Sequence, residues 1–208
     1  MSVVDSKLGR SRWALPVGMI LFCTAIRLVP WVLQRMGVDT TPNVTLYPWN
    51  FAPMTAVCLF GGACLADRRL AFIVPLAAHL VGDVGIALLT NTPNFGFYPG
   101  QGLVYACFLL SICLGLWLRN HRNVAAIAVS GILAESVFFI VTNLGMWYFG
   151  TWYAHTAAGL AACYIAAIPF FGRSLASTAM YSAALFGGYA LLEGREPSAA
   201  PELVEVRS

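Results

Sequence analysis

The stretch LAFIVPLAAHLVGDVGIALLT, residues 70–90, has the length and composition of a helix that crosses a membrane. About 20 apolar residues in a helix are needed to cover the ~30 Å hydrocarbon core of a bilayer. The rest of the 208-residue chain is similar, with 59% hydrophobic and only 10% charged residues. An ordinary soluble domain carries about 25% charged residues. The sequence therefore predicts an all-α fold, a polytopic transmembrane helix bundle.

Six to seven spans are expected from the apolar runs along the chain. The second run has 16 residues and either spans the membrane or enters and leaves on one side. Residues 1–192 form a single transmembrane domain in this interpretation, and the polar segment 193–208 is a disordered tail. The seven apolar runs are residues 14–33, 51–66, 70–90, 101–118, 124–148, 154–171 and 174–192.

Basic residues indicate how the spans are oriented. With all seven runs spanning and a cytoplasmic N-terminus, most arginines and lysines fall on the inner side, as the positive-inside rule expects. The prediction is a multi-pass protein of the cell (inner or plasma) membrane. The inner side would carry Lys7, Arg10, Arg12, Arg68, Arg69, Arg119, Arg122 and Arg173, and the outer side Arg35, Arg195 and Arg207.

Five of the polar side chains inside the predicted spans are the candidate substrate-binding residues: Arg27, His79, Asp83, Glu135 and Asn143. A charge at the centre of a span costs roughly 2.5–3.5 kcal/mol, so these groups should face the interior of the bundle. His79 and Asp83, four residues apart, share one helix face. Arg27, Asp83 and Asn143 fall in one outer layer, with His79 and Glu135 deeper. This pattern fits a ligand cavity, a proton relay or a structural salt bridge between Arg27 and Asp83.

The absence of catalytic motifs argues against an enzyme. The P-loop pattern and the H-E-x-x-H and G-x-S-x-G motifs are absent, and none of the six cysteines forms a C-x-x-C pair. We therefore predict no catalytic residues, no metal site and no cofactor, and a net charge of +3 spread over loops indicates no nucleic-acid partner. Small residues at every fourth position permit close helix contact, within the chain or with another subunit. They are Ala158, Ala162 and Ala166, then Ala179, Ala183 and Gly187.

Three stretches resemble a family of bacterial integral membrane proteins without an established activity. They are NFAPMTAVCLFGGACLADRRLAFIVPLAAHLVGD (50–83), FFIVTNLGMW (138–147) and ACYIAAIPFF (162–171), which carry N-F-x-P, L-F-G-G-A and A-x-P-F-F motifs. The layout also resembles, more loosely, the substrate-capture (S) components of energy-coupling factor transporters. That resemblance implies six helices, a substrate held near the outer face under loops, and a helix face that docks on a coupling subunit.

The expected function is small-molecule uptake, with substrate bound in the outer half of the bundle. The protein would be the substrate-capture component of a multi-subunit transporter, whose other chains are a membrane coupling subunit and ATPases. Two alternatives remain open at this point: an autonomous proton-coupled carrier and a membrane scaffold that transports nothing. The expected partners are the lipid bilayer and a small-molecule substrate.

Overall fold

The computed structural model describes residues 3–38 and 51–193, and it describes side chains from residue 13 onward. All regular structure in these ranges is α-helical, so the all-α prediction is confirmed there. The helices are α1 (Val3–Arg35), α2 (Met54–Cys64), α3 (Arg68–Thr90), α4 (Pro93–Gly96), α5 (Gln101–Leu118), α6 (Val124–Phe149) and α7 (Ala157–Glu193).

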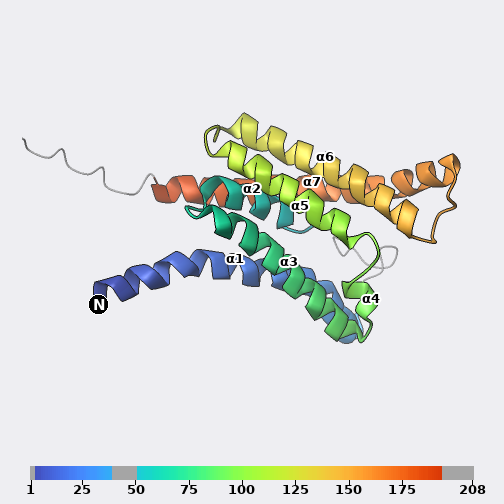
Figure 1. Cartoon of the computed structure of the whole chain (residues 1–208), viewed down its shortest axis with the longest axis horizontal. Coiled ribbons are helices and arrows are strands. Elements are labelled where there is room, and N and C mark those ends of the chain that lie inside the picture. Colours follow the sequence, from blue (N-terminus) through green and yellow to red (C-terminus); the bar gives the residue numbers. More distant parts are fainter. Residues whose placement is uncertain (1–2, 39–50, 194–208) are drawn as a thin grey trace, which may run out of the picture.

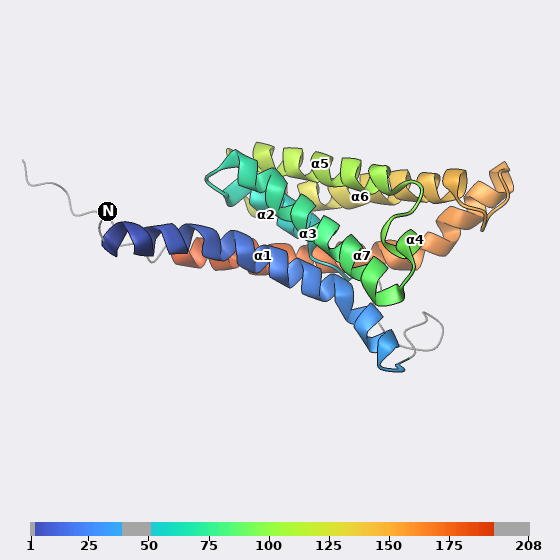
Figure 2. The same ribbon diagram turned by 60° about the horizontal axis from the view of Figure 1, so that its bottom comes forward.

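The helices run back and forth along one long axis. Helix α1 packs on α3, α2 on α5, and α6 on both α5 and α7. Figures 1 and 2 show that α1 begins at the same end of the bundle at which α7 finishes. The turn between α2 and α3 and the turn between α5 and α6 also lie at this end, which we call the basic end. Arg68 and Arg69 begin α3, and Arg119 and Arg122 follow α5, so these four lie at the basic end. Arg35 is the last residue of α1 and lies at the opposite end.

Among the described residues, five helices are long and apolar enough to span a membrane, fewer than the apolar runs of the sequence predict. Residues 157–193 form one helix of 37 residues, so the runs 154–171 and 174–192 are a single element. Pro169 lies inside this helix. Proline removes one backbone hydrogen bond, which kinks a helix without always ending it. Arg173 consequently lies on an exposed face midway along α7 and belongs to no inner loop.

The expected position of the chain's end also changes. Because α7 is one helix, it returns the chain to the basic end, whereas seven spans would have ended at the opposite one. Arg195, Arg207 and the predicted disordered tail, apart from Glu193, lie outside the described residues. The helices long and apolar enough to span are 13–35, 68–90, 93–118, 124–149 and 157–192.

Helix α2 is too short to cross a membrane. Its 11 residues extend roughly 16 Å at 1.5 Å each, and ten of them are buried. It crosses α5 at two glycines, because a Cβ on Gly62 would lie 2.7 Å from the Gly115 Cα. The last backbone carbonyls of α2 have no partner within the helix, and Arg119 supplies one. Its guanidinium donates to the Gly62 and Leu65 carbonyls at 2.6 and 2.5 Å. The run 51–66 is thus a buried half-length helix.

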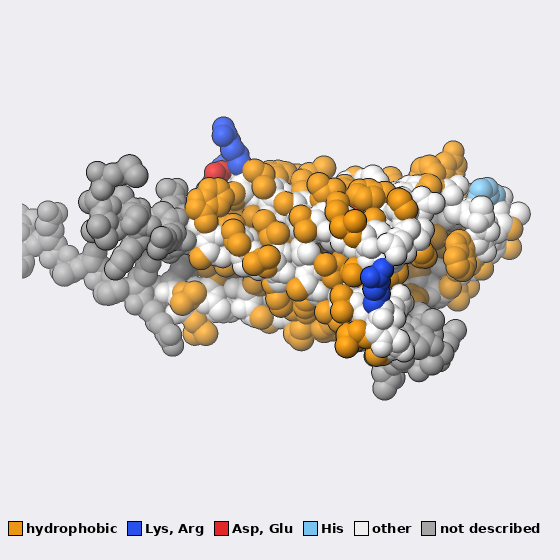
Figure 3. Space-filling model, turned by 90° about the horizontal axis from the view of Figure 1, so that it is seen from below, with side chains coloured by type: hydrophobic (Ala, Val, Ile, Leu, Met, Phe, Trp, Pro, Cys, Tyr) orange, Lys and Arg blue, Asp and Glu red, His pale blue; other side chains and the backbone are white. Residues whose placement is uncertain are grey.

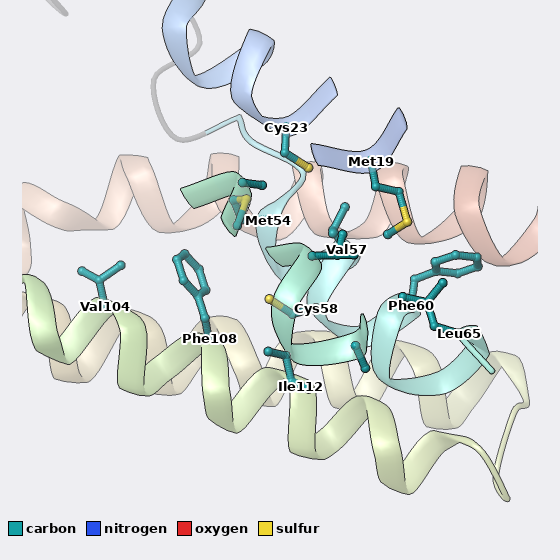
Figure 4. Close-up of a cluster of buried hydrophobic side chains, with 13 residues drawn as sticks. Met19, Cys23, Met54, Val57, Cys58, Phe60, Leu65, Val104, Phe108 and Ile112 are labelled. Carbon is teal, nitrogen blue, oxygen red and sulfur yellow. The ribbon is translucent and has the colours of Figure 1, made fainter. Parts of the chain in front are cut away.

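The core surrounds α2. Figure 4 shows Val57, Cys58 and Phe60 of α2 between Met19 and Cys23 of α1 on one side and α5 on the other. The outer surface is apolar as well, and Figure 3 shows hydrophobic side chains covering most of one face. Large exposed residues such as Val129, Ile132 and Ile140 follow α6. An apolar exterior of this extent suits lipid, and the several spanning helices make this a multi-pass membrane protein.

Candidate functional site

Asp83 is the anchor of the polar layer. It lies on α3 with no exposed surface, and its Oδ1 accepts from the Arg27 guanidinium of α1. Its Oδ2 accepts from the amide of Gln101 and, at 2.9 Å, from the hydroxyl of Tyr105. Gln101 and Tyr105 are four residues apart on α5, so one helix face supplies both donors. One buried carboxylate therefore holds three helices together.

The Arg27 side chain reaches Asp83 by passing over Gly82 of α3, where a larger residue would block it. A Cβ placed on Gly82 would lie 2.5 Å from Cδ and 2.9 Å from Nε of Arg27. The arginine side chain thus lies directly across the bare backbone of α3. Gly85, one turn further, similarly accommodates Leu28 of α1. The glycines allow the close approach of α1 and α3 that buries the ion pair.

The short helix α4 covers this ion pair from one side. Gln101 bridges the two, because the same amide nitrogen that reaches Asp83 also donates to the Gly96 carbonyl at 2.9 Å. Gly96 has no room for a side chain, since its Cβ would collide with the Asp83 carbonyl. On the far side, Phe95 packs against Trp31 of α1 with ring centroids 5.5 Å apart. The segment between α3 and α5 is therefore fixed to both α1 and α3.

His79 is buried, with 1% exposure, and neither of its ring nitrogens has a hydrogen-bond partner among the described residues. Its Nε2 lies 3.6 Å from Asp83 Oδ2, too far for a hydrogen bond. Tyr105 and Phe108 hold the ring edge-on, at centroid distances of 5.0 and 4.8 Å. A buried imidazole without partners is costly, because each unsatisfied polar group loses its hydration.

Glu135 lies on α6, 5% exposed, and accepts a 2.6 Å hydrogen bond from the hydroxyl of Thr178 on α7. Among the described residues, no arginine, lysine or histidine nitrogen lies within 4 Å of its carboxylate. Its position therefore differs from that of Asp83, which has a cation beside it. The two carboxyl groups of the bundle interior have different environments.

A cavity of about 670 Å³ joins these groups. It extends from the middle of the bundle towards the end opposite the basic end, where the residues preceding α5 and following α6 line it. Polar side chains of α1, α2, α3, α4, α6 and α7 contribute to its wall: Arg27, Thr55, His79, Asn94, Glu135, Thr142, Asn143 and Ser174. Aromatic side chains form about half of the remainder: Phe95, Tyr98, Phe108, Phe138, Phe139, Phe149, Trp152, Phe170 and Phe171.

Helix α6 contributes the most regular face of the cavity. Glu135, Phe138, Phe139, Thr142 and Asn143 recur at spacings of three and four residues and line it together. The Asn143 amide donates to the Phe139 carbonyl at 2.8 Å, so one of its donors is already used within the helix. The outer position predicted for Asn143 and the deeper one predicted for Glu135 thus correspond to two levels of one stripe.

Four of the five predicted residues line the cavity, and the fifth, Asp83, lies behind Arg27. Sequence reasoning missed Gln101 and Tyr105, which resemble the start of an ordinary span. Their spacing of four residues was the available signal. It also missed the aromatic wall, because phenylalanines in a membrane segment look the same whether they face lipid or a cavity.

The small-residue stripes have different surroundings from one another. Ala179, Ala183 and Gly187 line a second, apolar cavity of about 910 Å³ between α6 and α7, near the basic end. Ala158, Ala162 and Ala166 are exposed at the other end of α7. Among the described residues, no three His, Cys, Asp or Glu side chains come together as metal ligands would.

Fold and cavity together define a multi-pass α-helical membrane protein with a cavity of mixed aromatic and polar lining. The model of a family of unknown function (DUF6580) matches residues 7–200, and the chain belongs to that family. Neither the curated proteins nor the solved structures gave a match.

Proposed function

We propose that the protein takes up a small molecule and binds it in the 670 Å³ cavity, as the substrate-capture component of a transporter with further subunits. The cavity carries this proposal. Its volume falls within the range of roughly 300–1,000 Å³ typical of small-molecule sites, and its wall is mostly apolar with a few convergent polar groups. His79, with two unpartnered ring nitrogens in that wall, is a group that a ligand would satisfy.

The distribution of arginines supports binding from the outside. Among the residues whose side chains the structure describes, four arginines lie at the basic end and Arg35 lies at the other, which favours the basic end as the cytoplasmic side. The cavity then lies in the outer half of the membrane, below α4 and the turn that follows α6. The N-terminus and the end of α7 would both be cytoplasmic.

The helix order supports the comparison with the S components of energy-coupling factor transporters. Helices α1, α2, α3, α5, α6 and α7 are the six that this layout implies, and α1 begins and α7 ends on the same side. This likeness concerns architecture, and fold alone does not fix activity. The docking of a coupling subunit and ATPases therefore stays a part of the proposal.

Native mass spectrometry of the gently solubilised protein from its own source cells tests the proposal. We expect a bound small molecule, together with the masses of partner subunits. Thr142→Trp fills the cavity from α6 and should remove the ligand. Leu144→Trp adds the same ring to the exposed face of α6 and should retain it. A protein without ligand, or a ligand that survives Thr142→Trp, would contradict binding in this cavity.

The alternatives make different predictions in the same preparations. A proton-coupled carrier would show flux driven by a pH gradient in liposomes that contain this chain alone. A scaffold would show neither ligand nor flux. The capture component should bind its ligand and yet transport nothing until the other subunits are added.

A further inference from the structure

The charges around the cavity do not cancel. Arg27 lines it, but its guanidinium is paired with the fully buried Asp83, so these two formal charges neutralise each other. Within the described part of the chain, Glu135 has the neutral hydroxyl of Thr178 as its hydrogen-bond partner and no cation beside it. Among the described residues that line the cavity, Arg27 and Glu135 are those with a formal charge besides the titratable His79. By formal charge, the described lining of the cavity therefore has one negative group, Glu135, without a positive partner.

Aromatic rings line the same cavity as this carboxylate. Phe138 and Phe139 follow Glu135 by three and four residues and so lie on its face of α6. Phe138 stacks on Phe108 with ring centroids 5.7 Å apart, and Phe139 packs against Phe171 with ring centroids 4.8 Å apart. The faces of aromatic rings carry partial negative charge, and they attract cations when water is excluded. The carboxylate and the aromatic rings thus both favour a ligand with a positive charge.

We propose that the cavity binds a flat organic cation, with its ring among the phenylalanines and its positive charge beside Glu135. This inference rests on the proposed function and names its substrate class. An inorganic cation would leave most of the 670 Å³ unfilled, and among the residues that the structure describes no three His, Cys, Asp or Glu side chains come together to hold it. A ligand anion would have to compete with Asp83 for Arg27. His79 supplies a donor or an acceptor to a polar substituent of the ring.

Three probes of one shape test the sign of the charge: N-methylquinolinium, quinoline and quinoline-2-carboxylate, which are cationic, neutral and anionic near neutral pH. Binding is measured by equilibrium dialysis on the full chain in nanodiscs of a zwitterionic lipid, with empty nanodiscs subtracted. The cation should bind most tightly. Glu135→Gln keeps an acceptor for Thr178 but removes the charge, and it should weaken cation binding about tenfold or more.

Two further variants separate charge from structure. Asp67→Asn removes an exposed carboxylate at the start of α3, outside the cavity, and should leave all three affinities unchanged. Phe139→Leu keeps the cavity apolar and should weaken the cation several-fold, with a smaller effect on quinoline. If Glu135→Gln does not fold, the effect of Phe139→Leu on cation affinity still tests the inference.

The outcomes distinguish the two proposals. If quinoline or its carboxylate binds as tightly as the cation, and Thr142→Trp abolishes that binding, the cation inference is wrong while a ligand-binding cavity stands. The cation inference is equally wrong if Glu135→Gln and Phe139→Leu leave cation affinity unchanged. If none of the three probes binds in a manner that Thr142→Trp abolishes, the cation inference fails, and native mass spectrometry decides separately whether the cavity holds any other ligand.

Discussion

Replacing Asp83 by asparagine should destabilise the bundle more than any other single loss of a carboxylate. The amide can still accept from Gln101 and Tyr105, but its NH₂ group then faces the Arg27 guanidinium, donor against donor. Removing one partner of a buried ion pair costs about 3–5 kcal/mol, because a charge remains without compensation. The Arg27 side chain is 25% exposed, which places the expected loss near the lower limit, at about 3 kcal/mol.

The reverse change should cost more. Arg27→Gln leaves the charge on Asp83, whose side chain has no exposed surface, and we expect a loss near the upper limit of about 5 kcal/mol. The double variant contains no uncompensated charge, so it should be more stable than Arg27→Gln alone. Free energies of unfolding are measured by SDS titration in dodecylmaltoside micelles, with tryptophan fluorescence as the signal.

Asp67→Asn serves as the matched control. Asp67 accepts from the backbone N–H of Arg69 at 2.8 Å as the N-cap of α3, and asparagine is an equally good N-cap. We expect a change within about 0.5 kcal/mol, as for most surface substitutions. If the losses in Asp83→Asn and Arg27→Gln simply add in the double variant, the two charges do not interact and the account of the polar layer is wrong.

Two further predictions concern close helix contacts. Gly82→Ala should displace Arg27 and destabilise the bundle by about 1–3 kcal/mol, as overpacking commonly does, whereas Gly102→Ala, with open space around it, should be neutral or slightly stabilising. Gly115→Ala should be more damaging, because its Cβ would lie 2.5 Å from the Leu59 carbonyl oxygen of α2 and backbone cannot rotate away. Gly187→Ala, also in open space, is its control. The same SDS titration measures all four, and equal stability of Gly115→Ala and Gly187→Ala would disprove the tight crossing of α2 and α5.

Much of the polar layer could be predicted because a membrane restricts where charge can go. Arg27 and Asp83 lie in separate spans, and the cost of exposing either to lipid requires that both face inward. Their pairing follows once α1 and α3 are neighbours. The role of Gly82 could not be predicted, because a glycine matters here only through the side chain of another helix that crosses it.

The number of spans was harder to predict because hydropathy does not distinguish a break from a bend. Gly172 and Arg173 interrupt the apolar run of α7 and resemble a short inner loop. Helix propensity permits both residues within a helix, and contacts with α6, such as Thr178 with Glu135, stabilise this part of α7. The aromatic wall of the cavity was hidden for a related reason, since a uniformly apolar helix gives no sign of which face is lined by protein.

The short helix α2 has a consequence for how the chain enters the membrane during synthesis. Eleven residues are too few for the insertion machinery to release into lipid as an independent span. We expect α2 to enter only together with α3, as a hairpin closed by the turn at Asp67. Its last carbonyls then stay without their Arg119 donors until α5 has been made. The amino-terminal half of the protein should therefore be unable to complete its own interior before the next helix leaves the ribosome.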